Sequence, residues 1–189
     1  MNILLVNACA RKKSRTIKLA RKLAKKLGGD VTEVFLEKDR VSPLYGLPLV
    51  DRDILLDSGE FWDDTFANAR QFAGADVIIF AAPNWDLSFP GILKIYLESI
   101  NINGIAFERT EDGDIRGLCK AKRLYYVTTS GNAVGSETFG YGYVRALATM
   151  FWGIQHTRLV KAEDLNASGA DPEAIMDAVI AGIDVSDVK

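Results

Sequence analysis

The chain has 189 residues, of which 48% are hydrophobic and 25% are charged, and its formal net charge at pH 7 is −2. This balance excludes a strongly basic or strongly acidic protein, so we expect no nucleic-acid partner. No apolar run reaches the roughly 20 residues that span a bilayer, and the first residues lack the pattern of a signal peptide, so we expect a cytoplasmic protein without a membrane segment.

The chain begins with a predicted strand and helix. Residues 2–7 form a short apolar run, and a polar loop then leads to Ser14, which suits the N-cap of a helix. Apolar residues recur at helical spacing from Ile17 to Leu27, and Gly28-Gly29 can end that helix in a left-handed turn. This segment therefore predicts a βα unit.

The next segment leads back to the centre of the sheet. Residues 31–36 predict a second strand, and residues 37–59, which carry charges and prolines with little periodicity, predict a long surface excursion. A helix is expected from Phe61 to Phe72. The continuous apolar run 77–82 then predicts a strand that is covered on both faces, and Pro83 ends it.

The second half of the chain repeats the alternation of helices and strands. Pro90 suits the first turn of a helix that runs to Ile100, and residues 103–122 predict an excursion with a small hairpin. The remaining predicted elements are a strand over 123–129, a helix over 138–152, a strand over 153–161 and a last helix that starts at Asp171-Pro172.

Five strands alternate with helices in this prediction. Because parallel crossovers are nearly always right-handed, the pattern implies an α/β fold with a parallel sheet and helices on both faces. We expect the flavodoxin-like, doubly wound order 2-1-3-4-5 in a single domain over residues 1–189. The loops after strands 1, 3 and 4 would then meet at one edge, where open α/β sheets bind their ligands.

The loop after the first strand suits a phosphate group. Its helix N-terminus and the hydroxyls of Ser14 and Thr16 can bind phosphate oxygens. Four cations flank them, namely Arg11, Lys12, Lys13 and Arg15. The alternative is that Ser14 only caps the helix and that the cations are solvated. Because the chain has neither a G-x-G-x-x-G nor a G-x-x-x-x-G-K-[ST] motif, the phosphate would be that of a mononucleotide.

The loops after the third and fourth strands suit a flat heteroaromatic ring. Trp85, Leu87 and Phe89 offer apolar contact, and the backbone around them offers N–H groups. The alternative is that these three side chains only cover the edge of the sheet. In the loop after the fourth strand, small and polar residues would let the backbone approach the same ring. They are Thr129, Gly131 and Asn132.

Three stretches of the sequence together indicate a family. They are AAPNWDLSFPGILKIYLE, GIAFERTEDGDIRGL and VTTSGN. They resemble the FMN-dependent NADH-azoreductase and quinone reductase family of flavodoxin-like proteins, whose corresponding stretches read like AAPMYNF…LK, G-x-x-F-R-Y-T-x-x-G-x-x-G-L and T-S-R-G-G. The resemblance extends in order along nearly the whole chain, and the middle stretch is its most specific part.

The resemblance implies a noncovalently bound FMN. The phosphate would lie at the helix start, and the isoalloxazine ring would lie between the loops after the third and fourth strands. The residues implied are Ser14, Arg15, Thr16, Pro83, Asn84, Trp85, Asp86, Leu87, Thr129, Ser130, Gly131 and Asn132.

The family's activity depends on the flavin. The resemblance implies that NADH or NADPH passes a hydride to FMN, leaves, and is replaced by a quinone or azo compound in a ping-pong cycle. The protein then needs no catalytic acid, base or nucleophile. The resemblance also implies a homodimer, with Phe107 at the aromatic position that borders the substrate pocket.

Two positions depart from the family's motifs. Asp86 is a carboxylate in the flavin loop, and Ser130 stands where the family has an arginine. A carboxylate beside the flavin would disfavour an anionic reduced ring, which predicts a low potential or altered substrate choice unless Asp86 points outward or is protonated. A midpoint potential that rises in Asp86→Asn would support this hypothesis, and an unchanged potential would contradict it.

The remaining candidate residues have simpler explanations. His156 is expected to be packed or hydrogen-bonded, and no metal site is expected. Cys9 is expected to be a small buried thiol, and its spacing from Cys119 fits neither a disulfide framework nor a metal site. Nine cations and no acid lie between Arg11 and Lys26. A solvated helix face explains these cations, and the alternatives are contact with the phosphate of a nicotinamide cofactor or with an acidic partner.

Two functional classes follow from the sequence. The first is an FMN oxidoreductase that uses NADH or NADPH, and the second is a flavodoxin-like electron carrier or a non-enzymatic flavin-binding protein. Because single-electron carriers of this fold tend to present acidic docking surfaces, the near-neutral charge and the long segment around Phe107 favour a site for small molecules. Steady turnover of a nicotinamide with a soluble quinone would distinguish the two classes.

Overall fold

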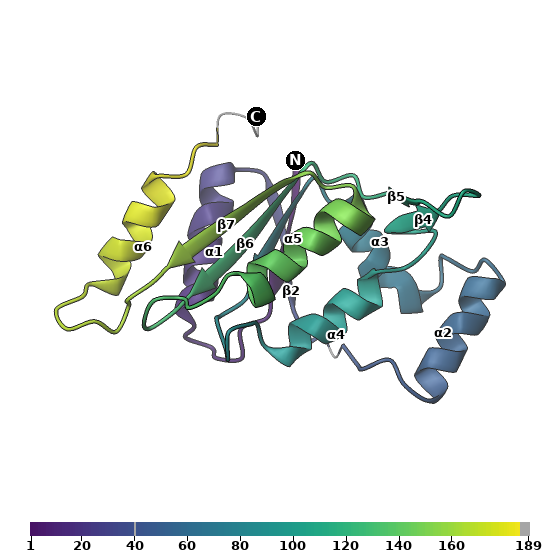
Figure 1. Ribbon diagram of the computed structural model, residues 1–189, viewed down its shortest axis with the longest axis horizontal. Coiled ribbons are helices and arrows are strands. Elements are labelled where there is room, and N and C mark those ends of the chain that lie inside the picture. The colour runs from purple at the N-terminus through teal and green to yellow at the C-terminus, as the bar shows by residue number, and fades with distance from the viewer. Residues whose placement is uncertain (40, 186–189) are drawn as a thin grey trace.

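The computed structural model describes residues 1–39 and 41–185. Its parallel strands are β1 (Asn2–Asn7), β2 (Asp30–Phe35), β3 (Val77–Ala81), β6 (Arg123–Thr129) and β7 (His156–Ala162). They form one sheet in the order β2-β1-β3-β6-β7, as Figure 1 shows. A separate antiparallel hairpin consists of β4 (Phe107–Arg109) and β5 (Ile115–Gly117). The predicted 2-1-3-4-5 order of the parallel strands is therefore confirmed.

Helices cover both faces of the sheet (Figure 1). They are α1 (Arg15–Leu27), α3 (Ala67–Gly74), α4 (Gly91–Ile100), α5 (Tyr143–Leu147) and α6 (Pro172–Ala181). Ile3 and Leu5 of β1 pack in the core with α1 and α6, whereas Leu4 and Val6 pack in the core with α3, α4 and α5. Since side chains alternate along a strand, burial on both faces explains the continuous apolar runs of the central strands.

The structure differs from the prediction between β2 and β3. The predicted excursion over 37–59 contains a helix, α2 (Leu47–Asp57), which lies at the periphery of the molecule (Figure 1). Pro48 indicates a loop in the sequence, but it lies in the first turn of this helix, where a proline costs little. The helix expected from Phe61 begins later, because the Asp63 side chain caps a 3₁₀ turn (Asp64–Phe66) that leads into α3.

The later elements follow the prediction more closely. The helix over 138–152 is α-helical only within α5, with π-helical turns at Thr138–Gly142 and Ala148–Trp152. The hairpin packs beside its end, and a Cβ added at Gly117 would lie 2.2 Å from the Gly153 nitrogen. The last strand begins at His156, since the chain first makes a left-handed turn at Gly153 (φ 73°).

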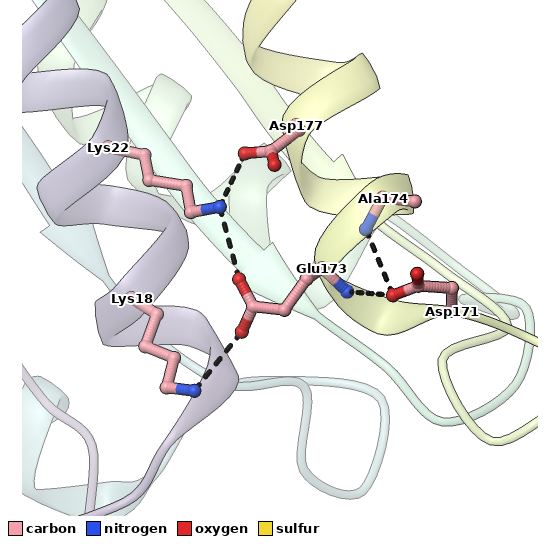
Figure 2. A network of polar contacts seen from close by, with 6 residues as sticks. All are labelled: Lys18, Lys22, Asp171, Glu173, Ala174 and Asp177. Atoms are coloured by element: carbon pink, nitrogen blue, oxygen red, sulfur yellow. Dashed lines mark hydrogen bonds and ion pairs between the residues drawn. The ribbon is translucent and has the colours of Figure 1, made fainter.

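The last helix is joined to α1 by ion pairs, which Figure 2 shows. Lys18 Nζ lies 3.1 Å from Glu173 Oε1, and Lys22 Nζ lies 3.1 Å from Glu173 Oε2 and also pairs with Asp177. The predicted N-cap of α6 is confirmed, because Asp171 Oδ1 accepts hydrogen bonds from the first N–H groups of the helix. Within the described ranges, no helix is both long and apolar enough to cross a membrane.

Candidate functional site

A cavity of about 390 Å³ lies where the loops after β1, β3 and β6 meet, and we call it the site cavity. Its volume is in the range of sites for small molecules. Nine of the predicted site residues line it, namely Ser14, Arg15, Thr16, Pro83, Asn84, Trp85, Thr129, Ser130 and Gly131. The structure thus brings the three predicted loops together at one edge of the sheet.

The loop after β1 presents the start of α1 to this cavity. Ser14 is the N-cap residue, but its side chain makes no capping hydrogen bond, and the first turn of α1 has no acidic residue. The Ser14 hydroxyl lies at the positive end of the helix dipole, where an anion binds favourably, and it also interacts with the Cys9 thiol. Thr16 is buried, and its Oγ1 lies 2.6 Å from the Oγ1 of Thr129, which ties this loop to the loop after β6.

The charge of the site cavity is entirely positive. Among the described residues that line it, Arg11, Lys13 and Arg15 are cationic and none is acidic. A cavity with this lining, at a helix N-terminus, favours an anionic ligand over a neutral or cationic one.

The loop after β7 also contributes to the site cavity, which the sequence did not predict. The Arg15 guanidinium donates hydrogen bonds to the Leu165 carbonyl oxygen (3.1 Å) and to Asn166 Oδ1 (2.8 Å). Both residues line the cavity. Only the predicted strand order could have indicated these two residues, because they follow β7, the strand beside β6.

Gly131 allows the loop after β7 to approach closely. A Cβ at this position would lie 2.3 Å from Asn166 Nδ2. The Asn166 N–H donates to the Gly131 carbonyl oxygen at 3.0 Å, and the Leu165 N–H donates to the Ser130 carbonyl oxygen at 3.3 Å. The missing side chain of Gly131 therefore makes room for Asn166.

The loop after β3 makes a tight turn. The Trp85 N–H donates to the Ser88 carbonyl oxygen (2.9 Å), and the Ser88 N–H donates to that of Trp85 (2.8 Å). The two central residues have positive φ angles, 50° at Asp86 and 70° at Leu87, as in a type I′ turn. Because neither is glycine, each costs on the order of 1–3 kcal/mol, a strain that typically accompanies functional sites.

Four predicted residues lie outside the site cavity. Asp86, Leu87 and Asn132 are exposed and do not line it. The exposure of Asp86 matches the alternative in which its carboxylate points outward. Phe107 does not line the cavity either, because its side chain is only 6% exposed and packs edge-on against Phe151, with ring centroids 5.1 Å apart.

The other candidate residues take no part in the site cavity. His156 is exposed at the start of β7, so the expectation that it is packed is wrong. Cys9 is a buried thiol as predicted, its Sγ lies 3.6 Å from the Ala81 carbonyl oxygen, and burial raises its pKa to about 11. In the part of the chain that the structure describes, no cluster of three or more His, Cys, Asp or Glu residues could hold a metal ion.

Comparison with known proteins agrees with this geometry. A family model described as flavodoxin-like fold matches residues 1–184. The chain belongs to this family. The azoreductase of Bacillus anthracis str. Sterne superposes on it with a TM-score of 0.78 at 21% identity, covering 96% of this chain and 95% of that one. An FMN-dependent NADH-azoreductase of Bacillus anthracis str. Ames Ancestor, solved in complex with FMN, gives a TM-score of 0.76 at 19% identity and the same coverage. At these identities the likeness shows the fold.

Curated relatives of this flavodoxin-like chain are more similar in sequence over a shorter stretch. FMN-dependent NADH:quinone oxidoreductase 2 of Clostridium acetobutylicum is 39% identical over 113 residues, which are 57% of this chain and 56% of the relative. FMN-dependent NADH:quinone oxidoreductase of Clostridium beijerinckii is 35% identical over 118 residues, which are 61% and 59% respectively. The aligned stretch thus spans little more than half the length of either relative.

Proposed function

We propose that this protein is an FMN-dependent oxidoreductase that uses NADH or NADPH to reduce quinones, azo compounds or similar small acceptors. The observation that carries the proposal is the site cavity, in which three cations, an N-cap hydroxyl that does not cap its helix and a partly exposed tryptophan meet without a carboxylate. The names of the curated relatives and of the structural neighbour with FMN support the same activity.

The lining residues fit the two ends of FMN. A phosphate suits Ser14, the α1 N-terminus and Arg15, whose guanidinium carries five N–H donors. The ring suits Trp85, whose side chain is 42% exposed, and the adjoining loop backbone. Within the described residues, the N–H groups of Asp86 and Leu87 donate to no protein acceptor, so they are free for a ligand.

The residues of the chain would act by binding and orienting. The chemistry that FMN supplies when bound is hydride transfer between a nicotinamide and an acceptor. Ser14 and Arg15 would fix the phosphate, and the strained turn would hold Trp85 in place against the ring. The proposed mechanism has a ping-pong order, in which the nicotinamide donor leaves before the acceptor binds. No side chain is assigned a proton transfer, because no acidic residue or histidine lines the described part of the cavity.

We further propose that the protein acts as a homodimer. A groove of about 700 Å³ next to the strained turn has an apolar wall that includes Phe89, Phe139 and Tyr143. Phe139 is 57% exposed and Leu87 is 51% exposed. Exposed apolar surface beside a site favours an interface between subunits. Light scattering coupled to size exclusion tests this, and a monomer at micromolar concentration would contradict it. The cytoplasmic location remains a prediction.

The first test of the proposed activity measures flavin binding and flavin reduction. Purified protein is titrated with FMN, and NADH or NADPH is then added without oxygen while the visible spectrum is recorded. We expect a bound flavin band that bleaches with the nicotinamide and returns when a soluble quinone is added. Bleaching without quinone turnover would favour an electron carrier, and the absence of flavin binding would overturn the proposal.

A further inference from the structure

A second cavity, of about 430 Å³, adjoins the site cavity, and we call it the β2 cavity. Its lining consists of Asn7, Arg11, Lys12, Ile17, Arg21, Glu33, Phe35, Lys38 and Asp39. Arg11 also lines the site cavity, so the two hollows share this residue. Four of the lining residues are cationic and two are acidic.

One cation and one acid of the β2 cavity neutralise each other. Glu33 accepts hydrogen bonds from Arg21 Nε (2.9 Å), from an Arg21 terminal nitrogen (2.8 Å) and from Asn7 Nδ2 (2.9 Å). Partial burial acts to raise the Glu33 pKa, but the bonds from Arg21 and Asn7 outweigh it and lower the pKa overall. The second acid is Asp39, whose Oδ2 accepts a hydrogen bond from the Phe35 N–H at 2.7 Å.

Three cations of the β2 cavity have no such partner. In residues 1–39 and 41–185, Arg11, Lys12 and Lys38 form no ion pair. The Lys38 side chain has weaker interactions: its Nζ lies 5.2 Å from the centroid of the Phe35 ring, and its charge helps to lower the pKa of Glu33. The formal positive charges of these three residues exceed the one formal negative charge of Asp39 by two.

The rest of the basic stretch behaves differently. Lys18 and Lys22 pair with acids of α6 (Figure 2), and Lys26 Nζ donates to the carbonyl oxygens of Ile180 (2.6 Å) and Ala181 (3.0 Å). A solvated helix face therefore does not describe them. Arg11 and Lys12, by contrast, precede a helix N-terminus, where positive charge is unfavourable unless an anion neutralises it.

We propose that the β2 cavity binds a phosphomonoester dianion carried by the ribose of a nucleotide. Lys12 and Lys38 bind the phosphate, Arg11 contributes from the rim shared with the site cavity, and Phe35 holds Lys38 in place. The nucleotide that the proposed function supplies is the donor, so the phosphate is the 2′-phosphate of NADPH. This assignment rests on the proposed function and predicts a preference for NADPH over NADH.

The test measures binding without turnover. In the calorimeter, 2′,5′-ADP, 5′-AMP and inorganic phosphate are each titrated into the flavin-loaded protein, in which the site cavity is filled. If no flavin binds, the Ser14→Asp variant is used instead, because its carboxylate repels phosphate from the site cavity. We expect 2′,5′-ADP to bind at least about tenfold more tightly than 5′-AMP, and this advantage to shrink as salt rises. Lys12→Gln and Lys38→Gln should each weaken 2′,5′-ADP about fivefold.

A matched control removes the same charge elsewhere. Lys25 is exposed near the other end of α1 and lines neither cavity, so Lys25→Gln should leave the affinity for 2′,5′-ADP unchanged. Equal affinities for 2′,5′-ADP and 5′-AMP, or lysine variants that bind like the parent protein, would overturn the proposal. Inorganic phosphate that binds as tightly as 2′,5′-ADP would also overturn it, because the site would then take free phosphate.

The outcome separates this proposal from the proposed function. Flavin affinity is measured on the same samples by fluorescence quenching. If the protein fails to bind flavin but still binds 2′,5′-ADP through Lys12 and Lys38, the proposed oxidoreductase activity is overturned and the proposed nucleotide site stands. If bound flavin bleaches equally with NADH and NADPH in the parent protein and 2′,5′-ADP does not bind, the proposed oxidoreductase activity stands and the proposed nucleotide site is overturned.

Discussion

The basic stretch formed by α1 and the loop before it divides into two regions. Both are rich in lysine and arginine, but their charges have different surroundings. Along the helix, Lys18, Lys22 and Lys26 pair with carboxylates and carbonyl oxygens of α6. Before the helix, Arg11, Lys12 and Lys13 line cavities and have no ion pair among the described residues. The comparison indicates that a count of charges does not reveal their role. Paired charges join elements of the fold, whereas unpaired charges around a cavity select an anion.

The largest effect is expected from a negative charge in the site cavity. Ser14→Asp places a carboxylate where the phosphate would bind, so FMN affinity should fall about 100-fold by repulsion. The helix should not suffer, because aspartate is a good N-cap. Fluorescence quenching by FMN and thermal unfolding measure the two quantities. Ser14→Asn keeps a cap without the charge and should bind FMN better than Ser14→Asp, and equal affinities would contradict a phosphate at this position.

A smaller effect is expected when a paired charge loses its partner. Arg21→Gln leaves Glu33 without its main donor, and since both side chains are partly exposed we expect a loss of about 1 kcal/mol in the free energy of unfolding at pH 7.

The pH dependence of that loss has a definite sign. Since folding lowers the pKa of Glu33, the pair contributes stability above the unfolded value, about 4.3, and this contribution disappears as the pH falls through the folded value. Urea unfolding of parent and variant should therefore differ at pH 7 and converge near pH 3. A difference that persists at pH 3 would mean that Arg21 stabilises the fold by packing.

The ion pairs between α1 and α6 should contribute less. Hydrogen bonds from Lys22 and Lys18 lower the pKa of Glu173, but its side chain is 52% exposed, so Glu173→Gln should lower the melting temperature by only about 2 °C. The difference should vanish in high salt. FMN affinity serves as the control and should not change, and a changed affinity would show that α6 communicates with the site cavity.

The smallest effect is expected at Asp86, which is exposed and lines neither cavity. Its carboxylate acts through water, so Asp86→Asn should raise the midpoint potential of bound FMN by only about 10 mV. Spectroelectrochemical titration measures this shift. A rise several times larger would restore the hypothesis that Asp86 depresses the potential directly.

Much of the fold could be predicted because the signals are local. The apolar run 77–82 requires a strand buried on both faces, Pro83 ends it, and Gly28 can adopt the positive φ angle at which α1 ends. The alternation of strands and helices then limits the topology to a few orders. The ends of β1, β3 and β6 predicted where the site cavity lies, and the structure places it there.

Other features depend on contacts between distant parts of the chain. Leu165 and Asn166 join the site cavity only because the loop after β7 pairs with the loop after β6, more than 30 residues earlier in sequence. Phe107 is buried in the core because the hairpin folds onto the end of the helix at Trp152. No local pattern contains such information, because it depends on which surfaces meet.

The charges illustrate the same division. The amino-acid sequence by itself determined that nine cations lie between Arg11 and Lys26 and that a helix begins after Ser14. Only the tertiary structure decided which of these cations meet a carboxylate and which face a cavity. The physical reason is that a helix fixes the spacing of its own side chains, whereas the partner of each charge is supplied by another element whose position depends on the packing of the whole core.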